Sequence, residues 1–149
     1  MARKKNKPLP SLQWLQPRMR LVHIASLLLL AALALLLAVW NHFFADLHGA
    51  RTWVITSIEL APLLLVGPGM LLGSPRAHAW ACFVMNLYFI KGILALIDPA
   101  RAWLGILETL LSVLLFTSAL LYTRWRYQYE RRMTGEGDPE TPAVAQQTL

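Results

Sequence analysis

Three ionisable residues interrupt long apolar stretches of the sequence: Glu59, Lys91 and Glu108. An ionisable side chain in an apolar setting is costly unless it is paired, so each of the three is a candidate for a functional role. A lysine that lies between two carboxylates can form a compact cluster with them. Such a cluster can fix the register of the segments that carry it, or it can bind a proton, a cation or a lipid headgroup. The residue types leave both interpretations open.

The segments around these charges have the length and composition of membrane-spanning helices. Of the 149 residues, 56% are hydrophobic and 15% are charged, whereas soluble domains have roughly 45–50% apolar and about 25% charged residues. Residues 21–40 include a single ionisable side chain, His23. A helix of about 20 apolar residues crosses a hydrocarbon core of roughly 30 Å. We therefore predict an all-α, polytopic membrane protein, a four-helix bundle with a transmembrane domain over residues 21–123 and helices at about 21–40, 52–72, 77–97 and 102–122.

The three charges fall at one depth in this arrangement. Each lies six or seven residues from the end of its helix on the same side of the membrane, which at 1.5 Å per residue is roughly 10 Å below that surface. Helical spacing places Thr56 on the face of Glu59 and Ser112 on the face of Glu108. We expect these two hydroxyls, together with Asn86, to form hydrogen bonds between helices.

The basic residues predict the orientation. The first 20 residues hold six Lys or Arg, the 73–78 turn holds one and residues 124–132 hold four, which makes 11 on one side. The 41–52 and 98–102 connections hold one each, which makes two on the other side. Because cytoplasmic segments of membrane proteins are rich in Lys and Arg, we expect both termini in the cytoplasm. The basic residues flank apolar segments, so the net charge of +6 indicates topology rather than nucleic-acid binding. The topology-setting residues beside the helices are Arg18, Arg20, Arg124, Arg126, Arg131 and Arg132.

The two ends of the chain are expected to differ in structure. We predict a basic cytoplasmic arm over residues 1–20, extended because Pro8, Pro10 and Pro17 interrupt helix formation. At the other end, the fourth helix should continue past the membrane through the arginines. The cytoplasmic region over residues 124–149 should then end in a disordered polar tail from Gly135 onward.

The second helix contains residues that disfavour a regular helix. Pro62 should kink it, because proline removes a backbone hydrogen bond and crowds the preceding turn. Gly67, Pro68 and Gly69 should unwind it near its cytoplasmic end. Carbonyl groups freed in this way must find partners in protein or water.

Two groups of residues are of types that can bind a metal ion or a haem, but their spacing and position favour simpler interpretations. His42, Asp46 and His48 lie in one connection, but their spacing matches no established zinc site, and a polar surface loop is the simpler interpretation. His23 and His78 fall near the same ends of the first and third helices, where they could ligate a b-type haem. Histidines this close to the interface need no special partner. We therefore predict no metal and no cofactor.

Several stretches of the chain resemble a family of bacterial inner-membrane proteins, domain of unknown function 2069. The stretches are ADLHGAR (45–51), PGMLLG (68–73), RAHAWACFVMNLYFIKG (76–92), DPAR (98–101) and LYTRWRYQYERR (121–132). The 76–92 stretch is the most specific, because its polar residues interrupt an otherwise apolar span. The resemblance covers roughly residues 9–133 and implies a small four-span protein of the cytoplasmic membrane of Gram-negative bacteria. It implies no activity and no catalytic residue.

The sequence leaves three functional hypotheses. The small size and the two minimal turns favour a non-enzymatic accessory or assembly partner of a membrane complex. The Glu59, Lys91 and Glu108 set favours a small transporter or proton-coupled carrier, which with four spans would need to form an oligomer. A membrane enzyme is the weakest hypothesis, because no nucleophile–base motif, cysteine pair or metal spacing supports it. The expected partners are the lipid bilayer and either another membrane protein or a second copy of the chain.

Overall fold

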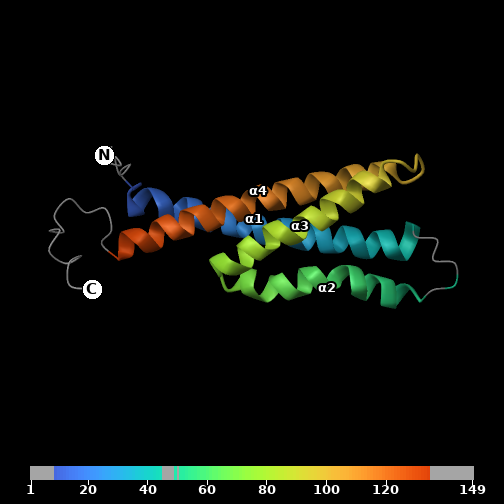
Figure 1. The fold of residues 1–149 in the computed structure, drawn as a ribbon, viewed down its shortest axis with the longest axis horizontal. Helices are drawn as coiled ribbons and strands as arrows, with labels where there is room; N and C mark the ends of the chain where they lie inside the picture. The colour runs from blue at the N-terminus through green and yellow to red at the C-terminus, as the bar shows by residue number, and fades with distance from the viewer. Residues whose placement is uncertain (1–8, 45–48, 50, 135–149) are drawn as a thin grey trace, which may run out of the picture.

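The structure is a computed structural model that describes residues 9–44, 49 and 51–134, and four long helices make up most of these residues. The helices are α1 (Leu12–Val39), which continues into the π turn η1 (Trp40–Phe44), α2 (Thr52–Leu71), α3 (Pro75–Ala95) and α4 (Ala102–Met133). They alternate in direction, so that α1 begins and α4 ends at the same end of the bundle (Figure 1). We call this the terminal end, and the opposite end the distal end.

All four helices are long and apolar enough to cross a membrane. Their outward faces carry exposed large apolar side chains such as Leu65, Trp80 and Phe83, whereas Leu33 and Leu115 are fully buried between helices. Apolar side chains on both the inside and the outside are what a lipid-embedded bundle requires. The predicted all-α architecture with four membrane-length helices is therefore confirmed.

The first helix begins at Leu12 rather than near residue 21, so the prediction of an extended arm is wrong for residues 12–20. Pro17 lies inside the helix and is exposed. Leu15 and Met19, one turn apart, are buried. The packing of this apolar pair outweighs the helix-breaking tendency of a single proline. Residues 1–8 of the predicted arm and the predicted tail from Gly135 lie outside the described residues.

The first turns of α1 pack against the last turns of α4. Trp14 contacts Trp125 edge to face, with 6.0 Å between the ring centroids. Arg132 donates hydrogen bonds to the carbonyl oxygens of Leu9 (2.7 Å) and Pro10 (3.4 Å). The 32 residues of α4 extend about 48 Å, well beyond a hydrocarbon core of roughly 30 Å. We call this helical pair, residues 12–20 with residues 124–133, the basic projection.

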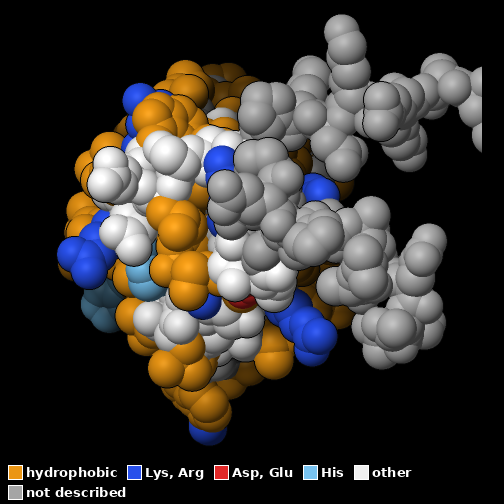
Figure 2. Space-filling model, turned by 90° about the vertical axis from the view of Figure 1, so that its left-hand side faces the viewer, with side chains coloured by type: hydrophobic (Ala, Val, Ile, Leu, Met, Phe, Trp, Pro, Cys, Tyr) orange, Lys and Arg blue, Asp and Glu red, His pale blue; other side chains and the backbone are white. Residues whose placement is uncertain are grey.

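The basic projection concentrates positive charge at the terminal end. Figure 2 looks at this end and shows Lys and Arg side chains at several places around it, separated by apolar side chains. The projection contains a single acidic residue, Glu130, against six arginines: Arg18, Arg20, Arg124, Arg126, Arg131 and Arg132.

The helix α2 stays continuous to Leu71, so the prediction that Gly67, Pro68 and Gly69 unwind it is wrong. Pro68 lies in the last turns of the helix and is exposed. A Cβ atom on Gly69 would lie 2.5 Å from the Cβ of Ala77, which shows that α2 and α3 approach closely here. That close packing favours the helical conformation over an unwound one. The helix also continues through Pro62.

The turn after α2 begins at Gly73 instead. Its φ of +70° is the left-handed conformation that glycine adopts most easily. The backbone N–H of Ser74 bonds to the carbonyl of Gly69 and that of Gly73 to the carbonyl of Met70, each at 3.0 Å. This pair of bonds is a Schellman motif, which ends the helix and satisfies its last carbonyl groups.

The helices α3 and α4 cross with their backbones in contact at two glycines. A Cβ atom on Gly105 would lie 2.7 Å from the carbonyl oxygen of Gly92. A Cβ atom on Gly92 would lie 2.5 Å from the Oγ1 of Thr109. Small residues at such crossings allow membrane helices to pack closely. Because Lys91 is next to Gly92 in the sequence, the crossing brings its backbone close to α4.

The glycine crossing predicts a difference between two Gly→Ala substitutions. Gly105→Ala should lower the free energy of unfolding by about 1–3 kcal/mol, because the new methyl group clashes with rigid backbone. Gly67→Ala is the matched control, since its Cβ would meet only Leu30, at 3.9 Å, and alanine is the better helix former. Thermal unfolding in detergent measures both. Equal melting temperatures for the two variants would contradict the close crossing.

Candidate functional site

A charged cluster lies toward the distal end of the bundle, centred on Lys91 of α3. The Nζ atom of Lys91 lies 2.9 Å from Oε1 of Glu59 on α2. The same atom lies 3.6 Å from Oε1 of Glu108 on α4. The structure thus brings together the three charges that the sequence placed at one depth. We call them the Glu–Lys–Glu cluster.

The first helix reaches the cluster through the π turn. Asn41 donates a hydrogen bond of 2.7 Å from Nδ2 to Oε2 of Glu59. The Nζ of Lys91 lies 5.1 Å from the ring centroid of Trp40, within range of a cation–π interaction. Both residues are buried although they are adjacent in sequence. The wider π turn, a feature often found at functional sites, accommodates two consecutive residues facing the bundle. All four helices therefore contribute to the cluster.

Tyr88 adds a further contact on the α3 side. Its hydroxyl donates to the backbone carbonyl of Glu59, and the side chain is buried. Tyr88 lies three residues before Lys91, so the two side chains share one face of the helix. Tyr88 was not among the residues predicted for the cluster, although its spacing from Lys91 in the sequence points to it. Trp40 and Asn41 lie at the predicted end of the first helix, and they were missed because hydropathy does not reveal the π turn that directs both into the bundle.

The two carboxylates of the cluster differ in their surroundings. Glu59 is 23% exposed, and its two oxygens contact Lys91 and Asn41 respectively. Glu108 is fully buried, and neither of its oxygens accepts a hydrogen bond from the described residues. The neighbouring Thr109 hydroxyl is also buried without a hydrogen-bond partner among them. Glu108 is therefore the member of the cluster with unused capacity to bind a proton or a cation.

The polar residues expected to bond between helices do not do so. Thr56 donates to the carbonyl of Thr52, Asn86 to that of Cys82 and Ser112 to that of Glu108. Each bond lies within one helix and spans four residues, so the prediction of interhelical bonds is wrong for all three. Short polar side chains in helices commonly bond back to the preceding turn in this way.

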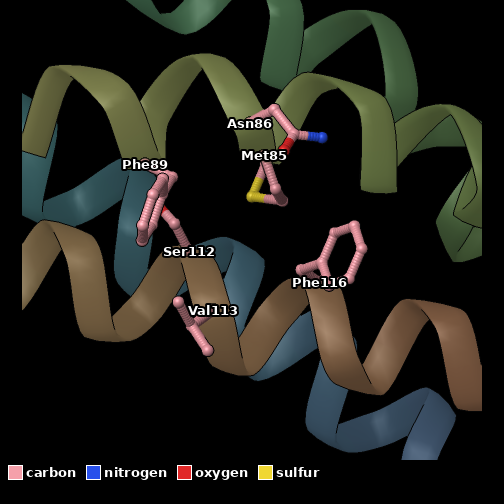
Figure 3. Close-up of a pocket in the computed structure, with 6 residues that line it drawn as sticks. All are labelled: Met85, Asn86, Phe89, Ser112, Val113 and Phe116. Atoms are coloured by element: carbon pink, nitrogen blue, oxygen red, sulfur yellow. The ribbon is translucent and has the colours of Figure 1, made fainter.

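Asn86 and Ser112 border a small, mainly apolar cavity between α3 and α4 (Figure 3). The cavity has a volume of about 180 Å³ and is lined by Met85, Asn86, Phe89, Ser112, Val113 and Phe116. None of the three charged residues lines it. The cavity is therefore separate from the Glu–Lys–Glu cluster.

The two histidines considered for haem use their ring nitrogens within the protein. Nε2 of His23 donates to the carbonyl of Met70 at 2.7 Å. Nδ1 of His78 donates to the carbonyl of Ser74 at 2.9 Å, and its Nε2 lies 3.3 Å from the hydroxyl of Ser26. His23 thus ties α1 to the end of α2, and His78 bonds to the first turn of its own helix and contacts α1 through Ser26, which are structural roles.

The metal-binding candidates in the first connection are only partly described. His42 lies in the π turn, whereas Asp46 and His48 lie outside the described residues. Within the part of the chain that the structure describes, no three His, Cys, Asp or Glu residues are grouped to hold a metal ion.

Residues 25–127 match the model of a protein family described as Predicted membrane protein (DUF2069). The match covers more than half of the chain. The protein belongs to the DUF2069 family. No curated protein and no solved structure matches the chain.

The DUF2069 match extends over the part of the chain that forms the site. It includes Glu59, Lys91, Glu108 and the π turn, and it ends within the basic projection. The family description names a membrane protein and no activity. The roles of the residues in this DUF2069 protein therefore rest on their geometry alone.

The short distance between Lys91 and Glu108 predicts that substitutions at the two residues have coupled effects on the free energy of unfolding. Lys91→Met should destabilise the DUF2069 protein, because it leaves a buried carboxylate without a counter-ion. Breaking a fully buried ion pair costs about 3–5 kcal/mol, and we expect less here because Lys91 is 34% exposed. Adding Glu108→Gln to Lys91→Met should recover part of the loss. Unfolding of both single variants and the double variant in detergent measures the coupling. Strictly additive effects would contradict a direct interaction between the two residues.

Proposed function

We propose that the protein is a non-enzymatic accessory or assembly partner of a larger complex in the bacterial inner membrane, with both termini in the cytoplasm. The observation that carries this proposal is the basic projection. It is an ordered helical pair that extends past the length needed to cross the membrane, and the described chain offers no other element of this kind outside the spans.

The contacts within the projection support a docking role. Trp14 packs on Trp125, and Arg132 fixes the backbone of residues 9 and 10. These contacts hold the start of α1 against the end of α4, in a region beyond the length that a helix needs to span the membrane. A preorganised surface binds a partner with less loss of conformational entropy than a flexible arm would. Its arginines suit a partner with an acidic surface.

The charge distribution supports the proposed orientation. The terminal end carries six arginines on the projection and Arg76 beside the α2–α3 turn. The distal connections carry one basic residue each, Arg51 and Arg101. Because basic segments stay on the cytoplasmic side, this asymmetry favours a cytoplasmic terminal end.

Co-purification at native expression tests the accessory role. Tagged protein extracted in mild detergent should retain a reproducible partner. Arg132→Gln should reduce the recovery of that partner severalfold, because it removes the hydrogen bonds that join the two halves of the projection. Leu65→Ala is the matched control, since Leu65 is an exposed residue of α2 away from the projection. The proposal fails if no protein co-purifies reproducibly, or if Arg132→Gln and Leu65→Ala retain the partner equally.

A second function is favoured by Glu108. Its buried carboxylate oxygens accept no hydrogen bond from the described residues, and the nearest cation, Lys91, also pairs with Glu59. A buried carboxylate of this kind suits a proton-coupled carrier. In such a carrier Glu108 takes up the proton, and the Lys91 ammonium shifts between the carboxylates of Glu59 and Glu108. With four spans, the carrier would act as an oligomer.

Proton flux into proteoliposomes tests the carrier. A potassium gradient with valinomycin sets the potential, and a trapped pH-sensitive dye reports proton entry. Glu108→Gln should abolish the protein-dependent flux, and Glu59→Gln should reduce it. Glu130→Gln, which neutralises an exposed carboxylate on the projection, is the control. Flux that is absent from the start, or unchanged when Glu59 and Glu108 are both neutralised, would exclude this second function.

A further inference from the structure

A polar cavity lies at the base of the basic projection, between α1, α4 and the turn that follows α2. Its volume is about 390 Å³. The side chains that give it chemical character are Arg20 and His23 of α1 with Tyr122, Arg126 and Tyr129 of α4. The cavity is far from the Glu–Lys–Glu cluster and shares none of its residues.

Two arginines from different helices line this one cavity. Arg20 is exposed and forms no ion pair with any described residue. Arg126 contacts Glu130 through its Nε at 3.2 Å and lies 5.8 Å from the ring centroid of Tyr129. The Nε contact leaves the terminal nitrogens of the Arg126 guanidinium for another acceptor. Two guanidinium groups around one cavity suit a phosphate group, whose oxygens match the paired N–H donors of arginine.

The floor of the cavity is held in place by backbone contacts. Tyr122 donates a hydrogen bond of 2.8 Å to the carbonyl of Gly73, and a Cβ atom on Gly73 would lie 2.9 Å from the Tyr122 hydroxyl oxygen. His23 donates to the carbonyl of Met70. The end of α2 is therefore fixed to both α1 and α4. The cavity is a preorganised site and does not depend on a flexible loop.

The depth of the cavity indicates the source of the phosphate. Arg20 lies 20 residues before Trp40, which is about 30 Å along α1. Arg126 lies 24 residues after Ala102, which is about 36 Å along α4. Both arginines thus lie just beyond a hydrocarbon core of roughly 30 Å, where lipid phosphates lie. Basic pockets between helices at this level bind anionic headgroups in membrane proteins.

We propose that the cavity lined by Arg20, His23, Arg126 and Tyr129 binds the phosphate of an anionic phospholipid headgroup. The two guanidinium groups hold the phosphate oxygens, and Tyr129 lies against the adjoining part of the headgroup. The site goes beyond the proposed accessory role and does not depend on it.

Native mass spectrometry of the delipidated full chain tests the site. The probes are short-chain phosphatidylglycerol, short-chain phosphatidylcholine and inorganic phosphate. The wild-type chain should retain phosphatidylglycerol in preference to phosphatidylcholine. Arg20→Gln with Arg126→Gln should lower the affinity for phosphatidylglycerol by about tenfold or more, because two charged contacts are removed.

The matched control is Arg18→Gln with Arg124→Gln. It removes the same charge from the same two helices, two residues from each pocket arginine, and neither residue lines the cavity. The control should keep the preference for phosphatidylglycerol. Equal losses in the two double variants would overturn the proposal in favour of general surface attraction, as would the absence of any preference in the wild-type chain.

Competition with inorganic phosphate distinguishes the two sources of the phosphate group. A lipid site should keep phosphatidylglycerol when millimolar inorganic phosphate is added. If inorganic phosphate displaces phosphatidylglycerol from the wild-type chain, and the pocket double variant does not bind inorganic phosphate, the lipid proposal is wrong. The ligand of the cavity is then a soluble phosphate. Should the pocket double variant fail to fold, Arg20→Gln alone tests the same point, because Arg20 is exposed and forms no ion pair among the described residues. Unchanged binding by that variant would also overturn the proposal.

Discussion

The ammonium group of Lys91 constrains the packing of all four helices. It pairs with Glu59 of α2 and Glu108 of α4, and it lies near the ring of Trp40 at the end of α1. An unpaired charge at this depth in a membrane would be costly, so each helix must present its partner at the right height and on the right face. Apolar contacts are less selective for register than this ion-pair cluster, because lipid tails are as apolar as the side chains.

The strongest polar contacts between helices gather in two layers, with a mainly apolar region between them. At the distal end lies the Glu–Lys–Glu cluster. At the terminal end, His78 lies against Tyr122, with 4.1 Å between ring centroids, and the Tyr122 hydroxyl bonds to Gly73. Leu33, Val66 and Leu115 are among the buried residues between the two layers. The two layers fix the register of the helices at both ends, while the glycine crossing of α3 and α4 sets how closely these helices approach.

Much of this arrangement could be predicted from the sequence, because hydropathy and charge report directly on a membrane environment. Counting residues from the helix ends placed Glu59, Lys91 and Glu108 at one level, and in the structure they lie within ion-pairing distance. The count succeeds because the rise of a helix per residue is nearly constant. It requires no knowledge of the partner helices.

The predictions that failed have a different physical origin, because each of these positions depends on contacts between segments that are far apart in the sequence. Pro17 does not break α1, because Leu15 and Met19 are buried by packing that lies far away in sequence. The Gly67 to Gly69 segment stays helical because α3 packs closely against it. Asn41 was assigned to a loop, but the π turn carries it into the bundle, where it bonds to Glu59. Local sequence preferences are weak, and tertiary packing overrides them at these positions.

In the bundle, Lys91 is shared between two carboxylates within the membrane-spanning segments. Solid-state NMR on the full chain in lipid bilayers measures this directly, through the dipolar coupling between the ¹⁵N-labelled Lys91 ammonium and the ¹³C-labelled carboxyl carbons of Glu59 and Glu108. The structure predicts coupling to both carboxyl carbons, stronger to that of Glu59 because this ion pair is shorter, 2.9 Å against 3.6 Å. Coupling to neither carboxyl carbon, with the Glu108 carboxyl group in contact with lipid acyl chains, would contradict the account.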